Sequence, residues 1–441
     1  MRFEVTDKLS DTMAVIVNRK LFPQYKLALV RYRDLVLPLC VLPGNHPDIR
    51  VRLDENTVLL TAKILRELNC SINDLDIKFV SWGLFTYGTL LPKWVSPNGY
   101  VGECWSDELR ESPYVRAILL DHKLVYSDHL PYALPFDGKR MLGVVYLDVS
   151  SSTISELDGI ETGAGYDVSQ TLVNIEENYP MRRKINVRFY VSRGMKYGRE
   201  VFTMFYGDIF YTRNDVKWFN YDSRGYFVSL EGNSPIILTA PHGGYWRPIN
   251  YPPVRNRESD EETYELVREI TVDIYELSGR SIVPYVMLAR LHRSRVDFNR
   301  RHEVIRSVIA RQYHDTIQRF LTMNKKAILL DIHGMHESNE YDIELGTNKG
   351  ETVRGAGDFL ETFHRELMRQ GFSVAIDEKY TGEYTVKNYG ASKNVIAIQI
   401  EINKRLRRIL NYRETAKKIA TAIMRTLNML ESSVRIKDSD I

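Results

Sequence analysis

The 441-residue sequence has few cysteines: Cys40, Cys70 and Cys104 are the only ones, and none forms a Cys-x-x-Cys pair. A small, odd number of isolated cysteines excludes both a disulfide framework and a thiolate zinc site. A long hydrophobic run is also lacking, because the most apolar stretch, residues 35–42, is too short to span a bilayer and includes Pro38. The first residues contain no apolar segment of the secretory type. We therefore expect a cytoplasmic protein with no membrane partner.

An excess of charge is absent as well. The 60 Lys and Arg residues nearly balance the 57 Asp and Glu residues, for a formal charge of +3. A field this weak does not by itself attract nucleic acid or anionic lipid, so any anion site must be local. The content of 44% hydrophobic and 27% charged residues is ordinary for folded chains, and the length predicts about two to four domains.

What is present divides into segments of different pattern. Residues 1–78 combine short β-type runs with one helix expected over residues 55–68, which predicts a small α+β segment without recognisable chemistry. Residues 79–211 are mostly β, with runs rich in Val, Tyr, Phe and Thr and one short helix over residues 153–157. The chain is therefore expected to be multidomain.

In residues 226–432, apolar runs alternate with amphipathic helices, which is typical of a parallel α/β sheet with helices on both faces. Predicted buried strands occupy residues 235–240, 327–331 and 395–400, and predicted helices occupy residues 260–277, 305–321, 357–369 and 412–430.

Polar residues follow these three buried strands. His242, His333 and Glu401 each stand where a strand is expected to end. Because ligands bind at the carboxyl ends of strands in open α/β sheets, the three side chains can converge. Two imidazoles and a carboxylate suit a metal ion and a general base, although each residue alone is equally compatible with a turn.

A hydrolytic zinc ion usually has a third protein ligand, for which Asp260, Glu261 and Glu262 are candidates that spacing cannot separate. Asp260 is our choice. Ser259 and Glu262 also fit a capping box, which would explain the acidic cluster without any metal.

A basic run covers residues 290–301, with arginines at 290, 293, 295, 300 and 301. Guanidinium groups grip carboxylates in a bidentate manner, so the run favours a pocket for an acidic substrate. The alternative is an RNA-contacting surface, but Phe298 is the only aromatic residue inside the run.

Together these motifs resemble the N-formylglutamate amidohydrolase family, which is related to zinc carboxypeptidases and aspartoacylase. The resemblance rests on residues 241–244, Asp260, residues 293–300, residues 331–334 and residues 399–403, in that order. It implies a zinc-peptidase-like fold and a zinc-dependent amidohydrolase, not an endopeptidase. The roles that it implies are zinc ligation by His242, Asp260 and His333, binding of a substrate carboxylate by Arg293, Asn299 and Arg300, and general base catalysis by Glu401.

One position departs from this pattern. In aspartoacylase-like relatives the acidic ligand comes three residues after the first histidine, where this sequence has Tyr245. Asp331 could orient a ligand histidine or simply be solvated. His336 and Glu337 follow closely and could replace an assigned ligand.

The middle segment resembles the gamma-glutamylcyclotransferase-like family. The resemblance rests on residues 79–90, 130–135, 143–146 and 156–166. It implies a small β-barrel in which Tyr87, Gly88, Thr89 and Leu90 frame a glutamyl pocket and Glu161 acts as acid/base, releasing 5-oxoproline from a γ-glutamyl amine. Without that resemblance, Glu161 would be read as a solvated turn carboxylate.

The sequence thus predicts a fused enzyme for small glutamyl or N-acyl amino acid substrates, with one or two activities, zinc as cofactor and no nucleic-acid partner. The alternative is a non-catalytic binding or regulatory protein that retains both folds.

Overall fold

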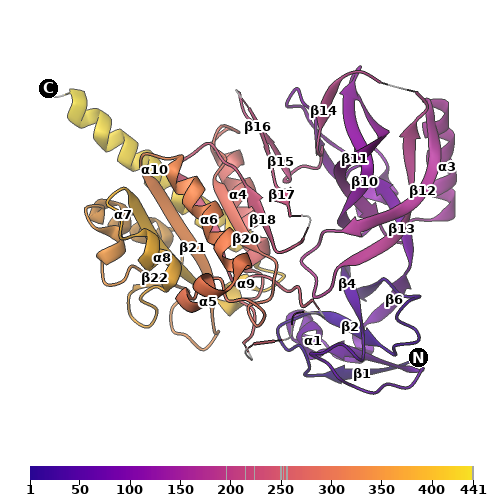
Figure 1. Ribbon diagram of the computed structural model, residues 1–441, viewed down its shortest axis with the longest axis horizontal. Helices are drawn as coiled ribbons and strands as arrows, with labels where there is room; N and C mark the ends of the chain where they lie inside the picture. The colour runs from indigo at the N-terminus through magenta and orange to yellow at the C-terminus, as the bar shows by residue number, and fades with distance from the viewer. Residues whose placement is uncertain are drawn as a thin grey trace. The chain divides into compact units, whose positions relative to one another are not determined.

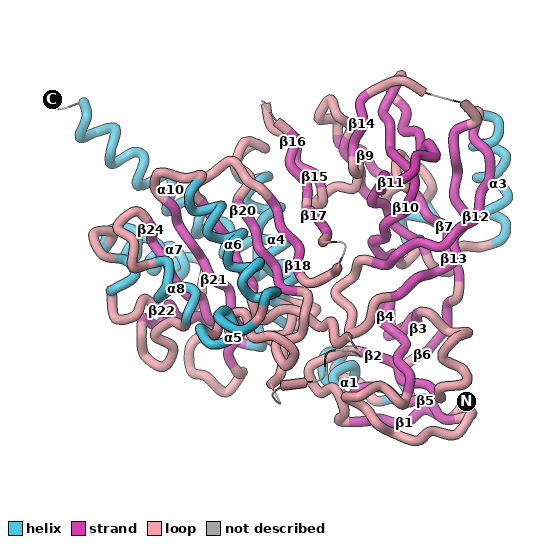
Figure 2. The backbone as a smooth tube through the Cα atoms, viewed as in Figure 1, coloured by secondary structure: helices cyan, strands magenta, loops and turns pink. Residues whose placement is uncertain are grey.

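The computed structural model describes residues 1–194, 196–213, 215–222, 224–248, 251, 253–254 and 257–439, the last nine as backbone alone. The chain divides into two compact units, which meet in sequence between Tyr211 and Thr212. No helix in the described ranges combines the length and apolar character needed to cross a membrane. All three cysteines are free thiols, as the sequence predicts. Figures 1 and 2 show the elements of both units.

The first unit begins with a six-stranded sheet in the order β1-β5-β2-β4-β3-β6. Its elements are β1 (Arg2–Thr6), β2 (Ala14–Val17), β3 (Leu27–Tyr32), β4 (Leu35–Pro43), β5 (Thr57–Thr61), α1 (Ala62–Leu68), the 3₁₀ turn η1 (Ile72–Asp74) and β6 (Asp76–Val80). The single helix predicted over residues 55–68 is wrong in its first half. The residues of β5 are all buried and pair with both β1 and β2, so distant strand partners override the helical spacing of the apolar residues.

The rest of the first unit is a closed five-stranded barrel. Its strands follow the order β11-β7-β13-β12-β10, β10 pairs back onto β11, and β14 attaches to β10. The elements are β7 (Trp82–Thr86), β8 (Lys93–Val95), β9 (Val101–Glu103), α2 (Asp107–Glu111), β10 (Tyr114–Ser127), β11 (Leu130–Tyr146), α3 (Ser151–Gly163), β12 (Tyr166–Ile175), β13 (Arg183–Ser192), β14 (Arg199–Val201) and β15 (Ile209–Tyr211). The predicted β-barrel is therefore confirmed.

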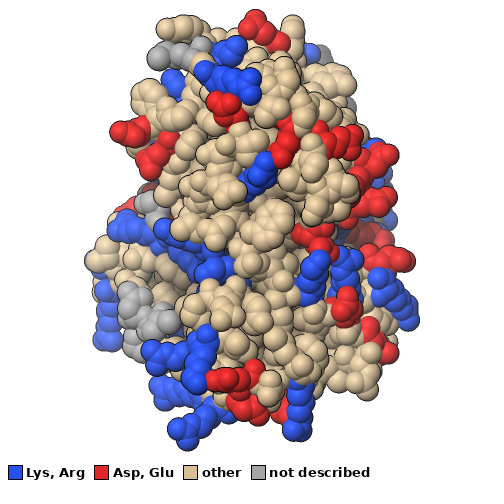
Figure 3. All heavy atoms as spheres, turned by 90° about the vertical axis from the view of Figure 1, so that its right-hand side faces the viewer, with Lys and Arg blue, Asp and Glu red and all other residues tan. Residues whose placement is uncertain are grey.

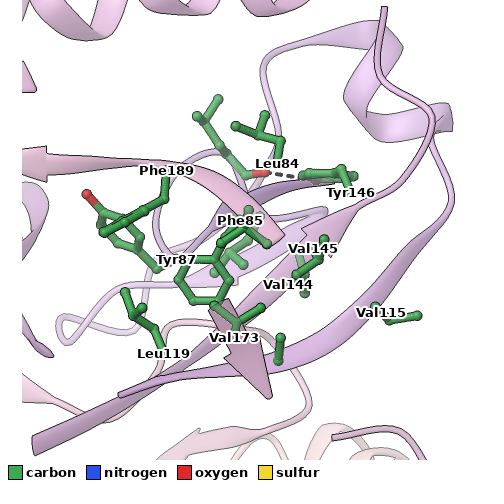
Figure 4. Packing of buried hydrophobic residues seen from close by; sticks show 14 of the residues in the cluster. Leu84, Phe85, Tyr87, Val115, Leu119, Val144, Val145, Tyr146, Val173 and Phe189 are labelled. Atoms are coloured by element: carbon green, nitrogen blue, oxygen red, sulfur yellow. Dashed lines mark hydrogen bonds between the residues drawn. The ribbon is translucent and has the colours of Figure 1, made fainter. Parts of the chain in front are cut away.

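The barrel is filled by large apolar side chains. Phe85, Phe189 and Tyr146 are almost completely buried, and the Phe85 and Phe189 rings meet edge to face with centroids 6.5 Å apart. Figure 4 labels the Phe85, Phe189 and Tyr146 rings. The Tyr146 hydroxyl donates to the Leu90 carbonyl at 2.8 Å, so the one polar atom of this buried ring is satisfied.

The helix α3 is longer than the predicted helix at residues 153–157. Ser150 caps its beginning by accepting a hydrogen bond from the Thr153 amide, and the helix continues to Gly163. Glu161 consequently lies in the last turn of a helix and not in a solvated turn.

The second unit contains an eight-stranded sheet in the order β17-β18-β20-β19-β21-β24-β22-β23. Its strands are β17 (Asn220–Tyr221), β18 (Phe227–Leu230), β19 (Ile236–Ala240), β20 (Tyr285–Ala289), β21 (Ala327–Met335), β22 (Ile343–Gly346), β23 (Val374–Ile376) and β24 (Val395–Asn403), and β16 (Val216–Trp218) lies outside this sheet. The central strands β20, β19, β21 and β24 are parallel, whereas β18 and β22 pair antiparallel with their inner neighbours. The predicted parallel sheet thus corresponds to the four central strands of the eight-stranded sheet.

Helices cover both faces of this sheet (Figure 1). The unit has α4 (Thr263–Leu277), α5 (Arg301–Arg306), α6 (Val308–Thr322), the 3₁₀ turn η2 (Glu351–Val353), α7 (Gly357–Arg369), α8 (Tyr384–Tyr389), α9 (Lys404–Arg407) and α10 (Tyr412–Ser439). Residues of α6 and α8 share one apolar cluster with Ile237, Leu329 and Ala397. On the other side α4 packs against α10. Burial on both faces explains why the central strands are continuous apolar runs.

Charged residues of both signs lie on the face of the molecule drawn in Figure 3, with Lys and Arg more frequent toward its lower part. The formal charge of +3 therefore results from cancellation between many charges and not from a shortage of them.

Candidate functional site

The two strands at the centre of the site run further than the sequence predicts. His333 lies within β21 and Glu401 within β24, and the two residues are direct partners in the parallel ladder. The expectation that both follow the end of a strand is wrong, because the ladder continues through the polar residues. Asp331 pairs in the same way with Gln399, so polar side chains follow the apolar ones on one face of the sheet.

His242 follows β19 on a closely packed turn. A Cβ atom on Gly244 would lie 2.5 Å from the Arg290 backbone, and one on Gly243 would lie 2.5 Å from the Tyr264 amide nitrogen, so these positions require glycine. The His242 carbonyl accepts hydrogen bonds from the Ser259 hydroxyl at 2.7 Å and from the Asp260 amide at 3.0 Å. These bonds bring the segment before α4 back to His242.

The predicted capping box at Ser259 does not form. The helix α4 begins at Thr263, its N-cap is Glu262 with φ of 59°, and the Ser259 side chain bonds to His242 instead. As a result Asp260 precedes the helix and points into the site. Its Oδ2 lies 3.3 Å from His242 Nδ1 and 3.2 Å from His333 Nδ1.

The structure separates the three acidic candidates. Glu261 forms an ion pair with Lys404 at 2.7 Å, and Glu262 accepts a hydrogen bond from the Tyr245 hydroxyl at 3.1 Å. Only Asp260 groups with the two histidines, and one ligand atom from each of the three residues lies within 4.8 Å of the others. Tyr245, which stands where relatives have an acidic ligand, holds Glu262 in place.

Each histidine has a second carboxylate on its opposite ring nitrogen. His242 Nε2 lies 2.7 Å from Asp297 Oδ1, and His333 Nε2 lies 2.9 Å from Asp331 Oδ2. Carboxylates in these positions favour a proton on Nε2 and orient each ring so that its Nδ1 faces Asp260. Asp331 therefore orients a histidine. The sequence patterns predict no role for Asp297, whose position within residues 293–300, two residues before Asn299, was the available signal.

The charges in this buried site shift one another's pKa values. Burial by itself would raise the pKa of Asp260, but Arg293 and the histidines hold it well below its usual range. Burial opposes protonation of His333, yet Asp331 and Asp260 raise its pKa well above the ordinary value. Burial raises the pKa of Glu401 to about 7, although His333 opposes the shift.

The donor set of His242, Asp260 and His333 fits a divalent transition metal ion. Two imidazole nitrogens and one carboxylate oxygen are typical of catalytic zinc sites with three protein ligands. The three side chains are almost fully buried, and the two rings lie with centroids 4.8 Å apart. Two carboxylates already orient the rings, so little rearrangement is needed to hold an ion.

The predicted carboxylate clamp lies beside this triad. Arg293 Nη1 donates to Asp260 Oδ1 at 2.8 Å, and Arg300 Nη1 forms an ion pair with Glu383 at 2.9 Å. The Nε atoms of both arginines are buried without a hydrogen-bond partner in the described structure. Each of these Nε atoms retains a donor that a bound carboxylate could accept from.

Asn299 is completely buried and contacts the chain at both ends of its amide. Its Oδ1 accepts from the Thr385 amide at 2.7 Å and from the Thr385 hydroxyl at 2.8 Å, while its Nδ2 lies 3.0 Å from His333 Nε2. These contacts fix the orientation of the amide and place it against the side of His333 that faces Asp331.

The arginine run does not form a continuous exposed strip. Arg290 and Arg295 are buried, at 3% and 4% exposure, and Arg293 is mostly buried. Most of the run thus lies inside the unit, which leaves little of it to contact RNA. His336 and Glu337 are exposed and bond to Ser338 and Arg408, away from the triad.

In the barrel, Glu161 lies half-buried in α3 near several tyrosines. Burial raises the pKa of this carboxyl, and Glu161 in turn interacts electrostatically with Tyr87, Tyr166 and Tyr190. None of the described residues forms a hydrogen bond or ion pair with its carboxylate, whereas the neighbouring Asp158 pairs with Arg188 at 3.0 Å.

The predicted glutamyl pocket residues surround a tight turn after β7. The Tyr87 hydroxyl donates to the Tyr190 carbonyl at 2.5 Å, and a Cβ atom on Gly88 would lie 2.1 Å from the Pro131 ring. Leu90 is buried and Thr89 is half-buried. This packing fixes the backbone of the turn beside Tyr87.

Residues 256–407 match the family model of N-formylglutamate amidohydrolases. This match confirms the family resemblance drawn from the motifs of the second unit. No curated protein matches the chain.

Solved structures with limited similarity were also found. An N-formylglutamate amidohydrolase from Ralstonia eutropha is 16% identical, with 48% of this chain and 99% of that chain covered and a TM-score of 0.39. A bacteriophage poly-gamma-glutamate hydrolase is 16% identical, with 47% and 90% covered and a TM-score of 0.29. A gamma-glutamyl cyclotransferase is 20% identical, with 26% and 68% covered and a TM-score of 0.20.

Proposed function

We propose that the second unit is a zinc-dependent amidohydrolase that cleaves the amide bond of an N-acyl amino acid or glutamyl amide. The observation that carries the proposal is the convergence of His242, Asp260 and His333, with each histidine oriented by a further carboxylate. The family match over residues 256–407 supports the type of bond cleaved. We further propose that the protein acts in the cytoplasm.

The three residues of the triad would hold the zinc ion. Such an ion supplies Lewis acidity, which polarises the scissile carbonyl and makes water more acidic. The chain's own residues supply the rest of the chemistry.

Glu401 is proposed as the general base. It is the ladder partner of His333, and Gln399 donates to its Oε1 at 2.7 Å, which leaves the other carboxylate oxygen available to the reaction. A carboxylate with a pKa near neutrality can accept a proton from water and return it to the leaving nitrogen. Burial, by raising the pKa of Glu401, thus suits this residue to accept a proton and to release it again.

Arg293 and Arg300 are proposed to bind the substrate carboxylate, with Asn299 beside them. The unsatisfied buried Nε atoms of the two arginines supply donors for that carboxylate. Asn299 is held by Thr385 against His333, so it positions the clamp relative to the triad.

For the barrel we propose release of 5-oxoproline from γ-glutamyl amines. Glu161, with its raised pKa, would take a proton from the substrate α-amine, which then attacks the γ-carbonyl; Glu161 would return the proton to the leaving nitrogen as the amide C–N bond breaks. The turn at Tyr87, Gly88, Thr89 and Leu90 would bind the glutamyl group. Both activities would then concern glutamyl groups in amide linkage, as successive or related steps.

Crossed glutamine variants test both assignments. Turnover of N-acyl amino acids and of γ-glutamyl amines is measured for the wild type, Glu401→Gln, Glu161→Gln and the exposed control Glu337→Gln. We expect Glu401→Gln to abolish only hydrolysis of N-acyl amino acids and Glu161→Gln to abolish only release of 5-oxoproline. Wild-type rates in both variants on every substrate cleaved would refute the catalytic assignments. An absence of stoichiometric metal and of any turnover would favour a non-catalytic binding protein.

A further inference from the structure

A pocket of 530 Å³ opens beside the arginine clamp. It is lined by two short stretches of chain, residues 299–302 and residues 383–388. Its volume falls within the range of about 300–1,000 Å³ that is typical of drug-sized ligands, so it exceeds the needs of a single substrate carboxylate.

The pocket includes Arg300 of the clamp, and two of its lining residues contact groups on the Nε2 side of the triad histidines, opposite Asp260. Asn299 Nδ2 lies 3.0 Å from His333 Nε2, and Arg300 Nε lies 3.7 Å from Asp297 Oδ2, the carboxylate that orients His242. A substrate held by Arg300 therefore has this pocket beside it, and any part of the substrate beyond the clamped carboxylate can extend into it.

The walls of the pocket carry a surplus of positive charge. Its one acidic residue, Glu383, already pairs with Arg300 at 2.9 Å, and His302 lies 3.4 Å from Glu303. Arg301 and Lys387 are exposed, and no acidic side chain among the described residues forms an ion pair with either. Two such cations, one on each of the two stretches that line the pocket, are suited to an anionic ligand.

We propose that this pocket binds the carboxylates of an extended acidic substrate, with Arg301 and Lys387 as the contacting cations. The substrate class is a short chain of acidic residues, such as linked glutamyl groups, joined to the residue whose N-acyl amide is cleaved. The inference rests on the proposed function for the position of the scissile bond, but its binding part stands independently of turnover.

Binding and turnover test the two parts separately. The affinities of glutamate, tri-γ-glutamate and a tri-γ-glutamate whose second and third residues are fully amidated are measured by calorimetry. We expect the wild type to bind the acidic trimer about tenfold more tightly than glutamate or the amidated trimer, because hydrogen bonds to charged groups are stronger than neutral ones. The advantage should decrease as salt is added, because both cations are exposed.

The double variant Arg301→Gln/Lys387→Gln should lose this advantage. Its matched control is Lys325→Gln/Lys326→Gln, which removes the same charge from exposed positions before β21 and should retain the advantage. In turnover of N-formyl derivatives, the preference of kcat/KM for the acidic trimer over N-formylglutamate should fall by a similar factor.

Equal wild-type affinity for all three ligands would overturn the inference, and so would an advantage that survives in the double variant. If a short oligoribonucleotide also binds about tenfold more tightly than glutamate, RNA and not an acidic peptide would be the ligand of the pocket. If the acidic trimer binds more tightly but no N-formyl compound is hydrolysed, the proposed function fails while the pocket assignment stands. If N-formyl compounds are hydrolysed but the acidic trimer binds no more tightly than glutamate, the proposed function stands and the pocket assignment fails.

Discussion

Glu401 in the second unit and Glu161 in the barrel are both carboxyls whose pKa is raised by burial, but their surroundings differ. Glu401 accepts a hydrogen bond from Gln399 and interacts electrostatically with all three residues of the triad, whose side chains contact one another. Glu161 is half-buried and has no hydrogen-bonded or ion-paired partner among the described residues. Burial thus raises the pKa of a carboxyl surrounded by the charges of the triad and of one that is isolated, but substitutions act differently at the two sites, because only the first is coupled to other charged groups.

The largest effect on activity should come from removing one of the three side chains of the triad. His333→Ala removes one donor of the triad, so we expect loss of stoichiometric zinc and a fall of at least about a thousandfold in amide hydrolysis, since metal catalysis is worth several kcal/mol. Metal analysis and steady-state kinetics measure the two effects. His364→Ala, on α7, is the matched control. Full zinc content in the folded His333→Ala protein would remove His333 from the ligand set.

A smaller effect is expected from the carboxylate behind the ligand. Asp331→Asn keeps the size of the side chain but weakens its hold on His333 Nε2, now 2.9 Å away. Zinc affinity should fall by about 10- to 100-fold while the ligand atoms persist. Competition with a chelator measures the change, and Asp358→Asn, at an exposed position of α7, serves as its control. Unchanged affinity would show that Asp331 is structural only.

The next prediction concerns stability of the metal-free protein. The pKa of Glu401 is about 7 in the folded state, against about 4.3 when unfolded, so folding favours its protonated form. That contribution is complete below pH 4 and is lost as pH rises through 7. Glu401→Gln should therefore become more stable than the wild type as pH rises, by on the order of 3 kcal/mol at pH 8. Urea denaturation at pH 4.5 and pH 8 checks this, and a difference independent of pH would contradict it.

The smallest effect is expected in the barrel. Because burial also raises the pKa of Glu161, its protonated form is favoured by folding, and stability is again lost as pH rises through the folded-state pKa. Glu161→Gln should stabilise the barrel at pH 8 by less than Glu401→Gln stabilises the second unit, since Glu161 is only half-buried. Added salt should change this difference little, because burial and not a charged partner is the cause. A large, salt-sensitive difference in unfolding free energy between Glu161→Gln and the wild type would show that Glu161 interacts with a charged group, as Glu401 does.

Local patterns were sufficient where local physics decides. The apolar runs at residues 235–240, 327–331 and 395–400 predicted buried strands, and the helix at residues 357–369 has the predicted bounds. At residues 55–61 the same method failed, because β5 obtains its stability from β1 and β2, which lie far away in the sequence. Spacing alone could not reveal those partners.

The residues that could form the site are recognisable from the order of the side chains, since imidazole and carboxylate groups follow the apolar cores of parallel strands. The packing of the folded chain selects Asp260, and not Glu261 or Glu262, as the partner of the histidines, because the segment before α4 folds back onto His242. It also decided that Asp297 reaches His242, which lies 55 residues away in the chain. Contacts over such separations depend on how strands and loops pack together, and no local pattern in the sequence records that packing.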